Sequence, residues 1–246
     1  MTPTDERVAI VTGGSRGIGA ATAKRLARDG FAVALTYRER REAADEVVAA
    51  IEADGGRALA VQADLAERDD VPRIFAATDE AFGGRLDALV LNAAAIPYGT
   101  VEELPEEQWE WAFAVNARAA FLAFREAGRR MMTEGGRVVA VSTGLAATPL
   151  ANTNAYSASK AAVEALAKSF AQEVGPRGIT VNAVRPGITD TEGLGIPQQL
   201  IDALVQQTPL RRLGQPEDLA DVIAFVCSPD ARWITGQVLY ASGGLG

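Results

Sequence analysis

Tyr156 and Lys160 are the residues of this chain whose types and spacing best suit chemistry. They lie four positions apart in the alanine-rich run Asn154-Ala-Tyr-Ser-Ala-Ser-Lys-Ala-Ala, which we expect to be helical, so both side chains share one helix face. A tyrosine ordinarily ionises near pH ~10, and a nearby ammonium group lowers that pKa by stabilising the phenolate. Such a tyrosine serves as a general acid or base. The alternative is an ordinary surface contact between residues four apart on a helix.

The composition favours the chemical interpretation and excludes several others. The 246 residues contain no histidine, the side chain most often used for proton transfer, and one cysteine, Cys227. We therefore expect neither a zinc site nor an internal disulfide. The net charge of −8 argues against a nucleic-acid surface, which needs concentrated positive charge. The N-terminal residues do not resemble a secretory signal, and no apolar run reaches the ~18 residues that span a bilayer, so we expect a cytoplasmic protein.

The pattern of apolar residues predicts one α/β domain over residues 1–246. Short β-rich apolar runs alternate with longer amphipathic runs, which is typical of βαβ units that build a parallel sheet. Seven strands predict a Rossmann-like, doubly wound sheet between two helical layers. The expected strands are 8–12, 32–36, 58–62, 88–91, 138–142, 180–183 and 238–240, and the expected helices are 17–29, 39–53, 69–82, 106–132, 155–174 and 216–227.

A glycine-rich loop follows the first expected strand and leads directly into a helix. The run Thr12-Gly-Gly-Ser-Arg-Gly-Ile-Gly19 spaces its glycines as Gly13, Gly17 and Gly19. At such a junction, backbone N–H groups and the positive helix end meet a pyrophosphate, and glycines permit its close approach. We therefore expect a dinucleotide-binding loop, the alternative being a plain glycine-rich turn. It is not a Walker loop, because no Gly-Lys-Ser/Thr follows.

The end of the second strand indicates which dinucleotide is bound. An acidic residue there binds a ribose 2′-hydroxyl and repels a 2′-phosphate. This chain has Thr36-Tyr37-Arg38 instead, and Arg16 lies inside the glycine loop. The two arginines suit a charge-assisted clamp on a 2′-phosphate, so we expect NADP(H) in preference to NAD(H). The alternative is that either arginine is merely solvated.

Taken together, these segments resemble the short-chain dehydrogenase/reductase family along essentially the whole chain, and the pattern is most similar to its 3-oxoacyl-carrier-protein reductases. The matching segments are the loop 12–19, Asp64 in Gln62-Ala-Asp-Leu, Asn92 in Leu91-Asn-Ala-Ala, Asn116, Ser142-Thr143, Tyr156 with Lys160, Arg185-Pro-Gly-Ile-Thr-Asp-Thr191, 211–218 and 234–240. The resemblance implies an enzyme that reduces a ketone or 3-oxo group to a secondary alcohol, or catalyses the reverse reaction. A second interpretation is a non-catalytic, NADP-binding regulatory protein on the same fold.

The resemblance also implies a set of cofactor contacts. Asp64 would accept a hydrogen bond from the adenine amino group, although it also suits a cap for the following turn. Asn92 would lie near the adenine ribose. The family's usual Asn-Asn-Ala-Gly reads Leu91-Asn-Ala-Ala94 here, which removes backbone freedom beside the cofactor. The expected contacts are Gly13, Ser15, Arg16, Gly17, Ile18, Gly19, Tyr37, Arg38, Asp64, Leu65, Asn92, Ala93, Ala94, Tyr156, Lys160, Pro186, Gly187, Ile188 and Thr191.

The family further implies a catalytic group around the tyrosine. Tyr156 would protonate the developing alkoxide, Lys160 would lower its pKa and bind the nicotinamide ribose, and Asn116 would hold a helix kink and a relay water. A family serine thirteen residues before the tyrosine orients the substrate carbonyl. That position is Thr143 here, with Ser142 one step earlier. Consecutive strand residues face opposite sides, so one of the two should enter the site, and the ungapped spacing favours Thr143.

The segment 188–212 is irregular and predicts a lid. Its apolar side chains suit a hydrophobic ketone, or else form the inner face of a lid helix packed on the domain; they are Leu194, Ile196, Leu200, Ile201 and Leu204. The expected helix 106–132 carries more aromatic residues than one buried stripe needs. In the family this helix and the Tyr156 helix pair across a dimer interface, and the last strand forms a second interface, so we expect a homotetramer.

Overall fold

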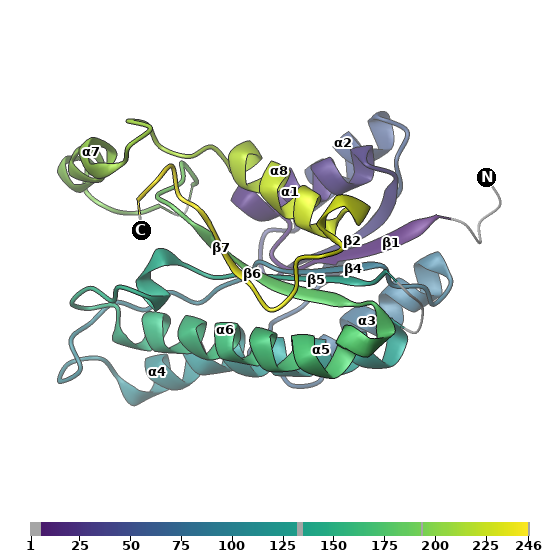
Figure 1. Ribbon diagram of the computed structural model, residues 1–246, viewed down its shortest axis with the longest axis horizontal. Helices are drawn as coiled ribbons and strands as arrows, with labels where there is room; N and C mark the ends of the chain where they lie inside the picture. The colour runs from purple at the N-terminus through teal and green to yellow at the C-terminus, as the bar shows by residue number, and fades with distance from the viewer. Residues whose placement is uncertain (1–5, 132–134, 193, 246) are drawn as a thin grey trace.

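A computed structural model of the chain describes residues 6–131, 135–192 and 194–245, and its elements are labelled in Figure 1. The strands are β1 (Arg7–Val11), β2 (Phe31–Tyr37), β3 (Ala58–Gln62), β4 (Ala88–Leu91), β5 (Arg137–Val141), β6 (Thr180–Pro186) and β7 (Val238–Ala241). The helices are α1 (Gly17–Arg28), α2 (Arg41–Ala53), α3 (Asp70–Phe82), α4 (Glu106–Ala112), α5 (Ala119–Arg130), α6 (Asn154–Val174), α7 (Gln198–Gln207) and α8 (Pro216–Cys227).

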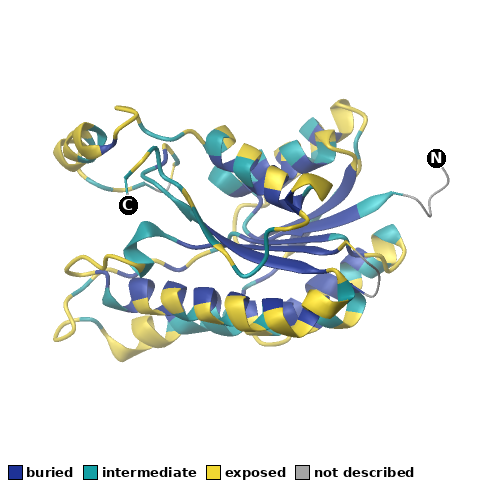
Figure 2. Ribbon diagram, in the orientation of Figure 1, coloured by how far each residue is buried: buried dark blue, intermediate teal, exposed yellow. Residues whose placement is uncertain are grey.

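The seven strands form one parallel sheet in the order β3-β2-β1-β4-β5-β6-β7. Helices α1, α2 and α8 cover one face, and α3 to α6 cover the other (Figure 1). Each face has its own apolar cluster, one around Leu35 and Ile223 and the other around Leu89 and Val163. The strands are almost continuously apolar because both faces are covered, which Figure 2 shows as a buried sheet between half-exposed helices. The predicted fold class is confirmed.

The helix expected over 106–132 differs most from the prediction. The structure divides it into α4, a π-helix η1 (Phe113–Arg118) and α5, while residue 132 lies outside the described residues. A single uninterrupted helix was therefore wrong. A π-turn admits one extra residue per turn without any special residue type, so the apolar pattern of the sequence does not reveal it. The ends of the other predicted elements differ by up to about three residues; β6, for example, continues to Pro186 because β7 pairs with it there.

The carboxyl ends of the strands meet at one edge of the sheet. Connections leave β1 and β4 in opposite directions along the sheet, since β2 lies beyond β1 and β5 lies beyond β4. Ligands of open parallel sheets bind at such a reversal point. None of the described helices is both long enough and apolar enough to span a membrane.

Candidate active site

Tyr156 lies in the first turn of α6 and is buried. Its side chain lies near that of Thr143, just beyond β5. Burial raises the pKa of Tyr156 to about 12; the Thr143 side chain opposes this rise, and nearby Tyr98 adds to it. The expectation that Lys160 lowers this pKa is not met in this structure, where Lys160 is not among the groups that shift the pKa of Tyr156 and desolvation is the largest cause.

Lys160 lies one turn further along α6 and is only 3% exposed. Its Nζ donates a hydrogen bond of 2.6 Å to the carbonyl oxygen of Val141, the last residue of β5. Burial lowers the pKa of Lys160 to about 8, while the carboxylate of Glu164 opposes that shift. An amine with this pKa is mostly protonated at pH 7 and loses its proton in the mildly alkaline range.

The two candidate hydroxyls have different partners. Ser142 is buried, and its Oγ donates to Glu164 Oε1 at 2.6 Å. Thr143 has extended backbone (φ −158°, ψ 153°), and its Oγ1 accepts from the N–H of Leu145 at 3.2 Å. The structure thus brings Thr143 to Tyr156 and turns Ser142 toward Glu164, two turns further along α6.

Asn116 is buried in the π-helix and joins two segments. Its Nδ2 donates to the carbonyl of Ala95 and to Ser159 Oγ, both at 2.9 Å, and its Oδ1 accepts from Ala95 N–H at 2.9 Å. The loop after β4 is thereby fixed to α6 beside Lys160. A cavity of about 20 Å³, lined by Thr12, Asn116, Lys160 and apolar side chains, lies behind the lysine. A cavity of this size holds one water molecule.

The glycine loop is packed too closely for larger residues. A Cβ on Gly19 would lie 2.2 Å from Gly13 O and 2.5 Å from Asn92 Nδ2. Gly13 has a left-handed backbone (φ 64°), which a side chain would strain. Asn92 Nδ2 donates to the carbonyls of Thr12 and Gly13, both at 3.1 Å, and so ties the loop to the end of β4. The arrangement exposes the first turn of α1, at Gly17, to the space above the sheet edge.

A cleft of about 440 Å³ extends from this loop across the ends of the neighbouring strands. The predicted cofactor contacts that line it are Gly13, Ser15, Arg16, Gly17, Ile18, Tyr37, Arg38, Asp64, Leu65, Asn92, Ala93, Ala94 and Thr191. Gly19 lies behind the loop, and Tyr156 and Lys160 lie beyond the cleft in α6. Pro186 ends β6, whereas Gly187 and Ile188 line a separate cavity of about 300 Å³ next to α8 and β7.

Three arginines border the cleft. Arg16 and Arg38 were predicted; Arg38 also pairs with Glu39 at 2.7 Å. The third, Arg40, was missed, and it pairs with Glu192 of the lid at 2.8 Å. The alternating charges of residues 38–40 were the available signal, but Glu192 is 152 positions away in sequence.

Asp64 and Ala94 lie just after β3 and β4, and the structure shows the capping contact of the first and the unstrained backbone of the second. Asp64 Oδ1 accepts from the N–H of Ala66 at 2.8 Å, so it caps the turn after β3 as one interpretation predicted, while its adenine contact stays a prediction. Among the described non-glycine residues, only Asn152 and Arg211 have a left-handed backbone. Alanine at position 94 therefore replaces the family's glycine without backbone strain.

The lid contains α7, whose described residues are all at least partly exposed. Leu200 is exposed, and Ile201 and Leu204 are half-buried. Figure 1 shows α7 standing away from the body of the domain, and Figure 2 shows its mostly exposed surface. Ile201 and Leu204, three positions apart, thus form a partly covered face of α7, and both interpretations of the lid stay predictions.

Fold and site geometry define a dinucleotide-dependent oxidoreductase of the Rossmann-like class. Comparison with known proteins identifies the family: a family model described as Enoyl-(Acyl carrier protein) reductase matches residues 13–246. The chain belongs to the short-chain dehydrogenase/reductase family, as the resemblance of its motifs predicted, and is an NAD(P)-dependent enzyme.

Two curated relatives match along their whole lengths. An uncharacterized oxidoreductase of Methylorubrum extorquens is 43% identical over 249 residues, which cover 100% of both chains. The 3-oxoacyl-[acyl-carrier-protein] reductase of Synechocystis is 40% identical and covers 100% of this chain and 99% of its own. Among solved structures, a short-chain dehydrogenase of Burkholderia cenocepacia in complex with NADP is 43% identical, with a TM-score of 0.92 and 97% of each chain covered.

Proposed function

We propose that this protein reduces a ketone or 3-oxo group to a secondary alcohol with NADPH, or catalyses the reverse reaction, with Tyr156 as the proton donor. The observation that carries the proposal is the buried phenol of Tyr156 beside the Thr143 side chain, with the buried Lys160 one helical turn away. Because burial holds the pKa of Tyr156 at about 12, the phenol is protonated at neutral pH. A protonated phenol can donate its proton to an alkoxide that forms beside it.

The neighbouring residues would divide the remaining tasks. Thr143 donates a hydrogen bond to the substrate oxygen and narrows the pocket with its methyl group. Lys160 binds the nicotinamide ribose through its ammonium group. Asn116 holds the loop after β4 and borders the cavity behind Lys160, where one water would return a proton toward Tyr156. The bound nicotinamide supplies the hydride to the carbonyl carbon.

The glycine loop fits a dinucleotide, because Gly19 leaves no room for a side chain and the first turn of α1 opens into the cleft. Arg16 and Arg38 would hold a 2′-phosphate, and Arg40 adds a third cation at the same end. The NADP bound to the Burkholderia relative supports this choice over NAD(H).

We further propose a homotetramer. Trp109 of α4 and Phe121 of α5 are large apolar side chains that this protomer leaves about half exposed. Elsewhere, Trp233, shortly before β7, is 96% exposed, and Phe225 of α8 is about half exposed. Exposed aromatic groups in two separate places suit two interfaces. Light scattering coupled to size exclusion tests this proposal, and a monomer at micromolar concentration contradicts it.

A panel of ketones and secondary alcohols, assayed with NADPH and NADH by cofactor fluorescence, tests the activity. Turnover of an apolar ketone with NADPH is the expected result. The competing proposal is a regulatory protein that binds NADP(H) without turnover, and the threonine at the position of the family's serine favours it. Tight NADPH binding with no turnover across the whole panel would establish that competitor instead.

A further inference from the structure

Glu164 is a buried carboxylate that the proposed mechanism does not use. It lies on α6 one turn beyond Lys160 and is 5% exposed. Arg185 of β6 holds it through two contacts, Nε to Oε1 at 2.7 Å and Nη2 to Oε2 at 2.5 Å. Ser142 Oγ donates to Oε1 at 2.6 Å. A carboxylate inside a protein needs a cation and hydrogen bonds to offset its desolvation, and Glu164 has both.

Three consecutive residues at the end of β5 each lie against one of three α6 residues spaced four apart, and the first two of these pairs are hydrogen bonds. The pairs are Val141 with Lys160, Ser142 with Glu164, and Thr143 with Tyr156. The pair of Ser142 and Glu164 is also attached to β6, because Arg185 of that strand binds Glu164. Because the three strand-end residues share one backbone, a displacement of Ser142 moves Thr143 relative to Tyr156.

Glu164 is also the charge that opposes the desolvation of Lys160. Burial lowers the pKa of Lys160, and the Glu164 carboxylate raises it. The other groups at Lys160 carry no free charge: Asn116 of η1 and the carbonyl of Val141 are neutral, and Arg185 is paired with Glu164. The phenol of Tyr156, on the same helix, is neutral at physiological pH. Loss of the Glu164 charge therefore favours the neutral amine of Lys160.

We propose that Glu164, held by Arg185, is a positioning residue for the reaction: through Ser142 it places Thr143 against Tyr156, and through its charge it keeps Lys160 an ammonium ion. The inference rests on the proposed function and adds a residue outside the group of four that the family resemblance implied.

The test is the pH dependence of kcat for ketone reduction in Glu164→Gln, which keeps the size of the side chain and an acceptor for Ser142. In the unsubstituted enzyme we expect kcat to fall as pH rises through about 8, the pKa of Lys160, because the ammonium form is lost there. Without the Glu164 charge this pKa is lower still. The fall of kcat with rising pH, which is the alkaline limb of the profile, should therefore occur roughly one pH unit lower. This lowers kcat about tenfold at alkaline pH and less at pH 6.

Two further variants separate the effect of the lost carboxylate charge from an effect on folding. Glu164→Asp keeps the charge and should return the alkaline limb toward its original position. If Glu164→Gln does not fold, because Arg185 is left buried without its partner, the double variant Glu164→Gln/Arg185→Gln leaves no unpaired charge and is assayed in the same way. Its limb should also move to lower pH.

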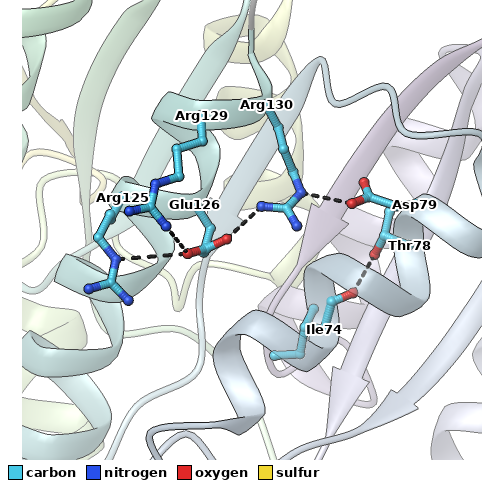
Figure 3. A network of polar contacts seen from close by, with 7 residues as sticks. All are labelled: Ile74, Thr78, Asp79, Arg125, Glu126, Arg129 and Arg130. Carbon is cyan, nitrogen blue, oxygen red and sulfur yellow. Dashed lines mark hydrogen bonds and ion pairs between the residues drawn. The ribbon is translucent and has the colours of Figure 1, made fainter.

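A matched control lies on α5, remote in the fold from the end of β5. Glu126 is 6% exposed, accepts from Arg130 Nη1 at 2.6 Å and from Arg129 Nη1 at 3.2 Å, and Arg130 continues to Asp79 of α3 at 2.8 Å (Figure 3). Glu126→Gln breaks a comparable buried pair, so it should lower the melting temperature while its pH profile keeps the original limb.

The outcomes distinguish this inference from the proposed function. A Glu164→Gln profile that overlays the original overturns the role of Glu164 and leaves the activity in place, whereas a loss of kcat equal at every pH overturns the part in which its charge keeps Lys160 an ammonium ion. Full activity in Tyr156→Phe overturns the proposed function itself. A limb displaced in Glu164→Gln, restored in Glu164→Asp and unmoved in Glu126→Gln is the expected result.

Discussion

Asn116 binds both backbone polar groups of Ala95, accepting from its N–H and donating to its carbonyl, each at 2.9 Å. One amide side chain thus pairs both backbone polar groups of a loop residue after β4, as a neighbouring strand pairs those of a residue within the sheet. The third contact, to Ser159 Oγ on α6, attaches the loop to the helix that carries Tyr156. The π-helix places the Asn116 side chain at the position from which it reaches both segments.

Asn116→Ala should therefore destabilise the protein and impair turnover together. It leaves the buried N–H and carbonyl of Ala95 without partners, which costs about 2 kcal/mol of unfolding free energy. Urea denaturation measures the loss. Thr100→Ala removes an exposed contact to Glu103 and serves as the control, with a change below about 0.5 kcal/mol. Equal stability of the two variants would contradict the structural role of Asn116.

Tyr156→Phe should abolish turnover while NADPH affinity stays within a few-fold of the original. The substitution removes the phenol that donates the proton and keeps the ring that fills the buried position. Steady-state assays and a fluorescence titration with NADPH give the two numbers from one preparation. Retained turnover would show that another group supplies the proton.

The threonine beside the tyrosine should matter more than the serine before it. Thr143→Val keeps the shape of the side chain and removes the hydroxyl, so we expect kcat to fall about 10²-fold. Thr143→Ser keeps the hydroxyl and should retain most of the activity. Ser142→Ala should have a smaller effect than Thr143→Val, since its hydroxyl faces Glu164. The opposite order would exchange the roles of the two hydroxyls.

Arg38→Asp should shift the cofactor preference toward NADH. The change removes a cation from the cleft and adds a carboxylate that repels a 2′-phosphate and binds a 2′-hydroxyl. We expect the KM for NADPH to rise about tenfold to hundredfold, with that for NADH unchanged or lower. Arg41→Ala is the matched control: Arg41 is exposed, pairs with Asp45 and does not line the cleft. An equal effect of both variants on the two cofactors would contradict the clamp.

Much of the fold could be predicted because its determinants are local. Strands buried on both faces must be nearly all apolar, and for this reason β4 (Ala88–Leu91), which is buried throughout, begins and ends where the sequence pattern places it. The π-helix has no such signature, because Phe113–Arg118 continue the residue types of the helices on either side. Its Asn116 contacts a loop about twenty positions earlier, and no local pattern records that contact.

The site divides in the same way. The spacing of Tyr156 and Lys160 follows from the helical period and is legible in the sequence. The partner of each hydroxyl depends on where β5 ends relative to α6, and a shift of one residue would exchange Ser142 with Thr143. The pKa of Tyr156 was expected to fall and instead rises, because the depth of burial is a property of the assembled layers. Sequence patterns therefore indicate candidate reacting groups more readily than their electrostatic state.

The helix α7 buries none of its described residues, so moving it exposes no core. Its displacement breaks the exposed and therefore weak Arg40–Glu192 ion pair near the start of the lid, and it uncovers the half-buried Ile201 and Leu204. We therefore expect that a bulky substrate can be admitted by an outward movement of one helix, with no repacking of the sheet. The breadth of accepted substrates would then depend on the hinges at either end of α7 as well as on the walls of the pocket.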